Sequence, residues 1–230
     1  MVPSASDRNA AVFVLNWQGT DKMSRKKKLG FINYDSFVGE YDHLIFAMMA
    51  SASIQQDTLP KNYLAEMLVQ VLGRNIEMYL ECLDRYEDFL NDPYATVQSI
   101  GETMYCGAEE TDIFSKTEDD MNYAVWSAQI KTLYHLLEEY RGSFVSKYRD
   151  AIAKNLPIKT PWGEEYKEPD DVELGTLKAL ACSRRVVLTD NEWKRLLAFY
   201  EARNKLSHLK VLAFHEVCDL IRWSHGMARR

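Results

Sequence analysis

The stretch from Thr189 to His208 reads TDNEWKRLLAFYEARNKLSH, and it sets the fold class of the chain. Thr189 followed three residues later by Glu192 is typical of a capping box, in which each side chain accepts a hydrogen bond from the other residue's backbone. This start signal predicts a helix from Asp190 to about Ser207. Apolar residues then recur at helical spacings of three and four along one face: Trp193, Leu196, Leu197 and Tyr200.

The last two turns of this helix replace apolar side chains with reactive polar ones. Asn204 and His208 continue the apolar face and are four residues apart. Arg203 and Ser207 have the same spacing, so each pair is adjacent on the helix surface. A lone buried imidazole or amide costs about a few kcal/mol unless it is paired. These side chains are therefore expected to meet water, a ligand or polar groups of a second subunit.

Similar helical periodicity dominates the rest of the chain, which has only ten glycines and six prolines to interrupt it. It predicts further helices over about 35–55, 60–90, 94–104, 117–154, 170–185 and 214–223. Thr117 and Asp120 fit a second capping box. The connection that contains Pro157 and Pro169 is long enough to be a functional flap or a disordered linker. The predicted fold class is all-α.

Length and composition indicate one domain. A chain of 230 residues with 47% hydrophobic residues has enough apolar material for a core. We expect an irregular N-terminal segment over residues 1–30 and a single α-helical domain over residues 31–230. The apolar run Ala10–Leu15 is too short for a signal sequence or a membrane span. The prediction is a cytoplasmic protein without a membrane segment.

The four cysteines are widely spaced, with no CxxC pair and no histidine at metal-ligand spacing. They are interpreted as reduced thiols in the core: Cys82, Cys106, Cys182 and Cys218. The other histidines also lack a surrounding set of carboxylates or thiols. The sequence therefore predicts no metal site and no cofactor.

Charge is distributed unevenly along the chain. The net charge is -6, yet residues 182–230 hold ten Lys and Arg against five Asp and Glu, while the remainder of the chain carries -11. The basic section contains Arg203 and His208, as expected if that face meets a polyanion. An alternative remains open, in which residues such as Arg184 and Arg185 only complement a helix C-terminus and solvate the surface.

The run from Trp193 to Trp223 resembles the HEPN (higher eukaryote and prokaryote nucleotide-binding) domains, which are all-α bundles. The family signature is an arginine, a polar residue, and then a histidine after four to six intervening residues. Arg203, Asn204 and His208 match its most common form. The resemblance implies a HEPN-like helical bundle of long helices with an N-terminal helical extension, with the motif region at residues 185–225.

Many HEPN proteins are metal-independent endoribonucleases, and the resemblance implies the same activity here. RNA brings its own nucleophile, the 2′-hydroxyl, so the protein need only move protons and stabilise the charge on the phosphorane. His208 is the candidate general base or acid, and Arg203 would bind the non-bridging phosphate oxygens. Asn204 would orient the imidazole or the phosphate, with Ser207 and Lys210 as auxiliary candidates. The implied products carry a 2′,3′-cyclic phosphate and a 5′-hydroxyl.

The resemblance also implies partners. Family members act as toxins or antiviral defence effectors, and their dimers place two motifs across a composite cleft. We therefore expect an RNA substrate, a homodimer with a composite active site, and an inhibitory or activating protein partner. Members silenced by a nucleotidyltransferase antitoxin carry a tyrosine two residues after the histidine, where this chain has Lys210. That mode of control is in doubt here, and Lys210 could add a phosphate contact instead.

Two other functions fit the same residues. One is a non-catalytic HEPN-like module that binds RNA, a nucleotide or a partner protein. The other is a helical scaffold protein in which the motif is a polar knob at a dimer interface, because buried polar groups can fix the register of helical assemblies. His215 likewise has two interpretations, as a second proton carrier or as a surface histidine.

Overall fold

The computed structural model describes residues 39–52, 54, 61–104, 113–160, 163 and 165–225. Every element below lies in the unit Glu40–Arg230. The irregular segment expected over residues 1–30 and the helix start expected at Asp35 lie outside the described residues.

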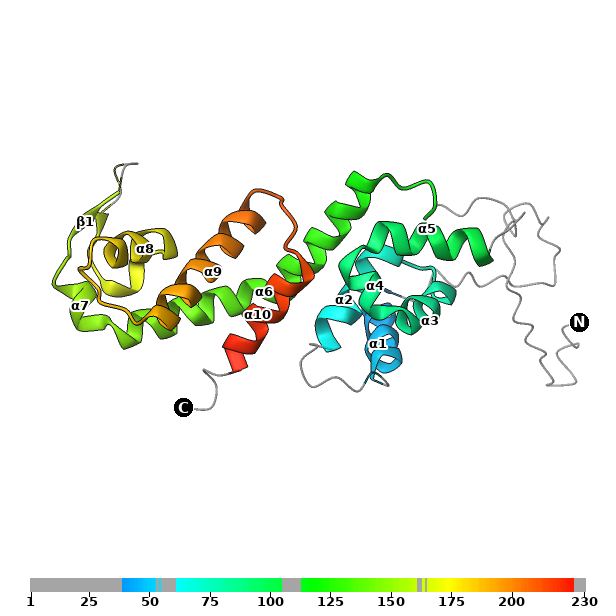
Figure 1. Cartoon of the computed structure of the whole chain (residues 1–230), viewed down its shortest axis with the longest axis horizontal. Coiled ribbons are helices and arrows are strands. Elements are labelled where there is room, and N and C mark those ends of the chain that lie inside the picture. Colours follow the sequence, from blue (N-terminus) through cyan, green and yellow to red (C-terminus); the bar gives the residue numbers. More distant parts are fainter. Residues whose placement is uncertain are drawn as a thin grey trace, which may run out of the picture. The chain divides into compact units, whose positions relative to one another are not determined.

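The described residues are mainly helical, which confirms the all-α prediction (Figure 1). Their α-helices are α1 (Glu40–Ser51), α2 (Lys61–Leu72), α3 (Glu77–Asp84), α4 (Tyr86–Asn91), α5 (Pro93–Met104), α6 (Glu118–Lys147), α7 (Arg149–Ala153), α8 (Leu174–Cys182), α9 (Asp190–Ser207) and α10 (Phe214–His225). Two short strands, β1 (Ile158–Lys159) and β2 (Glu165–Tyr166), and a 3-10 turn at Pro169–Asp171 lie between α7 and α8.

The prediction of one long helix over residues 60–90 is wrong, because the structure has three helices there, α2, α3 and α4. Gly73 ends α2 with a φ of 58°, a left-handed conformation that glycine adopts without a steric penalty. The apolar stripe hid this break, because Met78 and Cys82 of α3 return to the same core. The sequence therefore showed the buried face but missed the change of direction.

The connection after α7 contains a small hairpin. Strands β1 and β2 are antiparallel, with Ile158 opposite Tyr166. Both of these side chains pack partly buried against the core. The helix expected to begin at Asp170 starts instead at Leu174, because the 3-10 turn precedes it.

The C-terminal helices α9 and α10 pack against helix α6. The predicted capping box at its start is confirmed: Asp120 N–H donates to Thr117 Oγ1 at 3.2 Å, and Thr117 N–H donates to Asp120 Oδ2 at 3.0 Å. Figure 1 shows α9 running beside α6, with α10 packed against both. The rings of Tyr140 from α6 and Phe199 from α9 stack with centroids 3.9 Å apart.

The structure confirms the predicted bounds of α9 and its capping box, in which Glu192 accepts from Thr189 N–H at 2.8 Å. Its predicted apolar face is only partly correct. Four residues form the buried face: Leu196, Phe199, Ala202 and Leu206. Trp193, Leu197 and Tyr200 are half-buried at its side, Asn204 is half-buried, and His208 is exposed. Asn204 and His208 therefore lie beside the buried face of α9 and not on it.

The cysteines divide between core and surface. Cys82 is buried, and burial raises the pKa of its thiol to about 12, so it stays protonated. Cys218 is half-buried and Cys182 is exposed at the end of α8, so the core prediction is wrong for Cys182. Cys106 lies outside the described residues. Within the described part of the chain, each helix is too short or too polar to cross a lipid bilayer.

Candidate functional site

His208 lies just beyond the last residue of α9, where the helix ends in a Schellman motif. Lys210 N–H donates to Lys205 O at 2.9 Å, and Leu209 N–H donates to Leu206 O at 3.3 Å. Leu209 has a φ of 57°, the left-handed conformation that glycine usually supplies at this position. The imidazole of His208 and the side chain of Lys210 are both exposed. The backbone of the motif is thus sharply turned while its reactive groups face solvent.

A buried amide from α6 anchors the linker that follows, residues 208–213, here called the α9–α10 linker. Gln129 is only 1% exposed. Its Nε2 donates to Leu212 O at 2.9 Å, and its Oε1 accepts from Leu212 N–H at 2.8 Å. The same Nε2 lies 3.2 Å from Tyr63 Oη of α2. One side chain therefore satisfies both backbone groups of buried Leu212 and joins α2, α6 and the linker.

A second long-range bond fixes the end of α9 itself. The indole Nε1–H of Trp126 donates to Leu206 O at 2.8 Å across 80 residues of sequence. Leu206 is buried beside it. Trp126 thus fixes the backbone before His208, and Gln129, one turn further along α6, fixes the backbone after it. The sequence placed Trp126 on an apolar stripe and gave no signal for Gln129.

The guanidinium of Arg203 is already engaged in an ion pair. Its Nη2 lies 3.0 Å from Glu173 Oε2, at the residue that precedes α8. The Arg203 side chain is 38% exposed and that of Glu173 is 57% exposed. Exposed pairs of this kind stabilise a protein by only about 0–1 kcal/mol. A phosphate could therefore replace the carboxylate at small cost.

Lys205 is held by the start of α10. Its Nζ lies 2.7 Å from Glu216 Oε1, and Glu216 Oε2 also accepts from Ala213 N–H at 2.9 Å. Burial, the largest single effect, would raise the pKa of Glu216, but the hydrogen bonds from Lys205 and Ala213 outweigh it and the pKa lies below its usual value. Lys205 therefore links the end of α9 to the first turn of α10.

The remaining motif side chains differ in their availability. Ser207 Oγ donates to Arg203 O at 2.8 Å, which ties its hydroxyl proton to its own helix. Asn204 is half-buried, and its side chain makes no hydrogen bond within the described residues. His215, in the first turn of α10, is exposed. Asn204, His208 and Lys210 are thus the motif side chains open to a ligand, with Arg203 available after it leaves Glu173.

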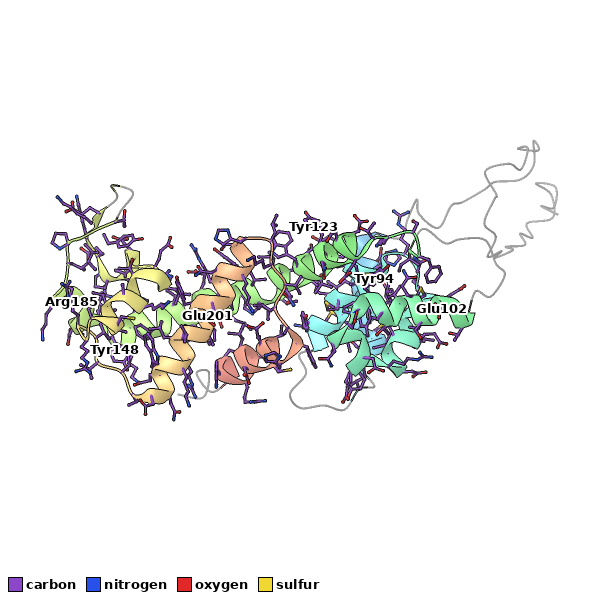
Figure 2. The ribbon with its side chains drawn as sticks, turned by 45° about the horizontal axis from the view of Figure 1, so that its top comes forward. Tyr94, Glu102, Tyr123, Tyr148, Arg185 and Glu201 are labelled. Atoms are coloured by element: carbon purple, nitrogen blue, oxygen red, sulfur yellow. The ribbon has the colours of Figure 1, made fainter. Side chains whose placement is uncertain are left out.

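Beside the motif lies an open hollow of about 410 Å³ that the sequence did not predict. It is lined by Asp119, Asn122 and Tyr123 of α6 and by Leu209, Lys210 and Val211 of the linker. Figure 2 labels Tyr123, whose side chain stands out from α6 and is 62% exposed. Nearly 90 residues of sequence separate the two sides of this hollow, so no local pattern could have joined them.

The described residues of the basic C-terminal section, 182–225, do not form one patch. Arg203 and Lys205 are paired with carboxylates, and Arg222 lies 3.1 Å from Asp219. Arg184 and Arg185 precede α9 whereas Lys210 follows it, and an 18-residue helix separates them by roughly 27 Å. Figure 2 shows Arg185 well apart from Tyr123, which lines the same hollow as Lys210. Near the motif, Lys210 is the exposed lysine without an ion pair among the described residues.

Within the described part of the chain, no three His, Cys, Asp or Glu side chains lie close enough together to hold a metal ion. No family model, no curated protein and no solved structure matches the chain. The HEPN resemblance therefore rests on Arg203, Asn204 and His208 and on their place at the end of a capped helix.

Proposed function

We propose that this protein is a metal-independent endoribonuclease of HEPN type. The observation that carries the proposal is the exposed imidazole of His208 on a linker anchored by Gln129, with the half-exposed guanidinium of Arg203 in the preceding turn. RNA cleavage without a metal requires a proton carrier and a cation, and His208 and Arg203, five residues apart in the chain, offer these two groups.

The chemistry needs two proton transfers and one site for negative charge. A base takes the proton of the 2′-hydroxyl, whose oxygen attacks the adjacent phosphorus and closes a 2′,3′-cyclic phosphate. The 5′ oxygen leaves and receives a proton from an acid, which gives the 5′-hydroxyl product. His208 would serve as base or acid, and Arg203 would bind the non-bridging oxygens through its planar fork. Asn204, open to a ligand, would orient the phosphate.

One chain supplies one Arg203–His208 pair, whereas the reaction uses both an acid and a base. We therefore propose a homodimer in which two motifs share one composite site. Light scattering at micromolar concentration should give twice the mass of 26.7 kDa. A strictly monomeric protein that still cleaves RNA would refute the composite site.

The deciding experiment is RNA cleavage in the presence of EDTA. Purified protein is incubated with labelled tRNA, mRNA and single-stranded RNA, and products are tested for the cyclic phosphate end. His208→Ala and Arg203→Ala should each lower the rate by about 100-fold or more. His135→Ala changes an exposed histidine of α6, and Arg149→Ala breaks an exposed pair with Asp170, so both should cleave normally. Equal rates in all five proteins, or none in the wild type, would end the proposal.

One observation favours a second candidate, a module that binds RNA or a partner without cleaving it. Arg203 and Lys205 both end on carboxylates, as they would if their role were structural. This candidate predicts salt-sensitive RNA affinity without products. A helical scaffold predicts neither RNA binding nor cleavage, and a loss of stability as the main effect of His208→Ala.

The proposal extends to the biological role as a cytoplasmic toxin or antiviral defence effector with an inhibitory or activating protein partner. Expression of the wild type should arrest growth, because an unrestrained ribonuclease destroys cellular RNA. Expression of His208→Ala to the same level should not. Arrest by both proteins would show that the toxicity does not come from cleavage.

A further inference from the structure

We infer that the hollow beside the motif binds a nucleobase of single-stranded RNA next to the cleaved phosphate. This inference rests on the proposed function, because it assigns the substrate class of the same site. Leu209 and Lys210 line the hollow and directly follow His208 in the chain. An RNA strand with its phosphate at His208 would therefore pass the mouth of the hollow.

The first support is an exposed aromatic ring in an open hollow. Tyr123 is 62% exposed, and its ring lies 5.3 Å from that of Trp126, which supports it from one side. Exposed aromatic rings stack on unpaired bases without demanding a particular sequence. The hollow is open to solvent, so a base could enter it from the side.

The second support is the set of polar groups around that ring. Lys210 is an exposed cation without an ion pair among the described residues, so it can meet a phosphate. Asn122 offers both donors and acceptors, and Asp119 can accept from the amino group of a base. A ring, an amide, a carboxylate and an ammonium together match a nucleotide better than they match an apolar ligand.

The third support concerns the kind of RNA. Duplex RNA keeps its bases stacked inside the helix, so it cannot offer a base face to Tyr123. A single strand can turn one base out at low cost. The hollow is therefore expected to favour single-stranded over double-stranded RNA.

The experiment measures binding of a fluorescent single-stranded RNA 12-mer and its duplex by anisotropy, in full-length protein carrying His208→Ala so that no cleavage intervenes. Tyr123→Ala should weaken single-strand binding about fivefold or more, and Tyr123→Phe should keep it, because stacking needs only the ring. Tyr134→Ala changes another exposed tyrosine of α6 and should have no effect. The duplex should bind more weakly and respond little to Tyr123→Ala.

The salt dependence separates the two contacts. Lys210→Gln should weaken binding and lower the slope of log affinity against log salt by about one, whereas Tyr123→Ala should leave the slope unchanged. Lys194→Gln, at an exposed lysine in the first turns of α9, is the matched control and should change neither.

Two outcomes would overturn the inference: no RNA binding, or binding that is equal in the parent and in Tyr123→Ala. Cleavage by protein with an intact His208 is measured separately. Cleavage without dependence on Tyr123 refutes the base site and leaves the proposed function standing. Binding that depends on Tyr123, without any cleavage, refutes the ribonuclease and keeps the base site.

Discussion

The linkers on either side of α9 end their helices in the same way but are held differently. Both α8 and α9 end in a Schellman motif with a non-glycine residue in the left-handed conformation, Arg184 at a φ of 56° and Leu209 at 57°. The α8–α9 linker, residues 183–189, receives no hydrogen bond from a side chain outside α8 and α9 among the described residues. The α9–α10 linker is bound by Gln129 at Leu212.

The two linkers therefore differ in the side-chain hydrogen bonds that they receive from other helices. Val186 of the α8–α9 linker is buried, so apolar contact and hydrogen bonds to the flanking helices α8 and α9 keep that linker in place. The α9–α10 linker, which carries His208, gains buried hydrogen bonds that apolar packing does not supply. Catalytic groups must be held to within a fraction of an ångström, and fixed hydrogen bonds provide such positioning. The linker that we assign to catalysis is thus the one with the more directional anchor.

Removing the anchor should give the largest effect. Gln129→Met keeps the side-chain volume but leaves the N–H and C=O of Leu212 buried without partners, so it should lower the free energy of unfolding by about 2–4 kcal/mol. Urea denaturation measures this loss. Gln70→Met, at a half-buried glutamine of α2, is the control and should cost about 0.5–1.5 kcal/mol. Equal losses in the two variants would contradict the anchoring role of Gln129.

The two left-handed residues give a matched pair of substitutions. Leu209→Gly and Arg184→Gly should each raise stability by up to about 1 kcal/mol, because relief of the left-handed penalty exceeds the added unfolded-state entropy of glycine. Thermal unfolding should show a small rise in Tm for both. Only Leu209→Gly should also change RNA affinity, since Leu209 lines the hollow and Arg184 does not. A fall in Tm for either variant would contradict the strain argument.

Lowering the pH should weaken the hydrogen bonds of Glu216 that hold the α9–α10 linker. The pKa of Glu216 is lowered in the folded protein, so its stabilising effect is present above about pH 4.5 and is lost as pH falls through the folded pKa. Glu216→Gln should lower stability by less than about 1 kcal/mol at neutral pH and flatten the acid limb of a stability–pH curve. An acid limb identical to that of the wild type would show that Glu216 contributes nothing.

The smallest effect on stability is expected from breaking the ion pair between Arg203 and Glu173. Glu173→Gln should change the free energy of unfolding by about 0–1 kcal/mol, yet raise RNA cleavage by up to about fivefold because Arg203 no longer leaves a carboxylate to bind phosphate. Asp170→Asn breaks the more exposed pair with Arg149 and should leave cleavage unchanged. Slower cleavage in Glu173→Gln would mean that Glu173 positions Arg203 instead of competing for it.

Local signals in the sequence predicted local structure well and long-range contacts poorly. The capping boxes at Thr117 and Thr189 located two helix starts, because each box involves residues only three apart. The division at Gly73 was missed because a buried stripe continues through it. The face of α9 was misplaced because half-buried Tyr200, over which Lys178 lies 4.1 Å from the ring centroid, looks as apolar in sequence as a core residue.

The sequence alone determined that this chain is helical, where α9 begins and ends, and which reactive residues stand together at its C-terminus. Periodicity and capping act over a few residues, so they can be read along the chain. Only the tertiary structure decided that His208 faces solvent, that Gln129 anchors its linker and that Tyr123 meets Lys210 across the hollow. Those contacts join residues about 80 positions or more apart, and chain folding, not local spacing, brings such residues together.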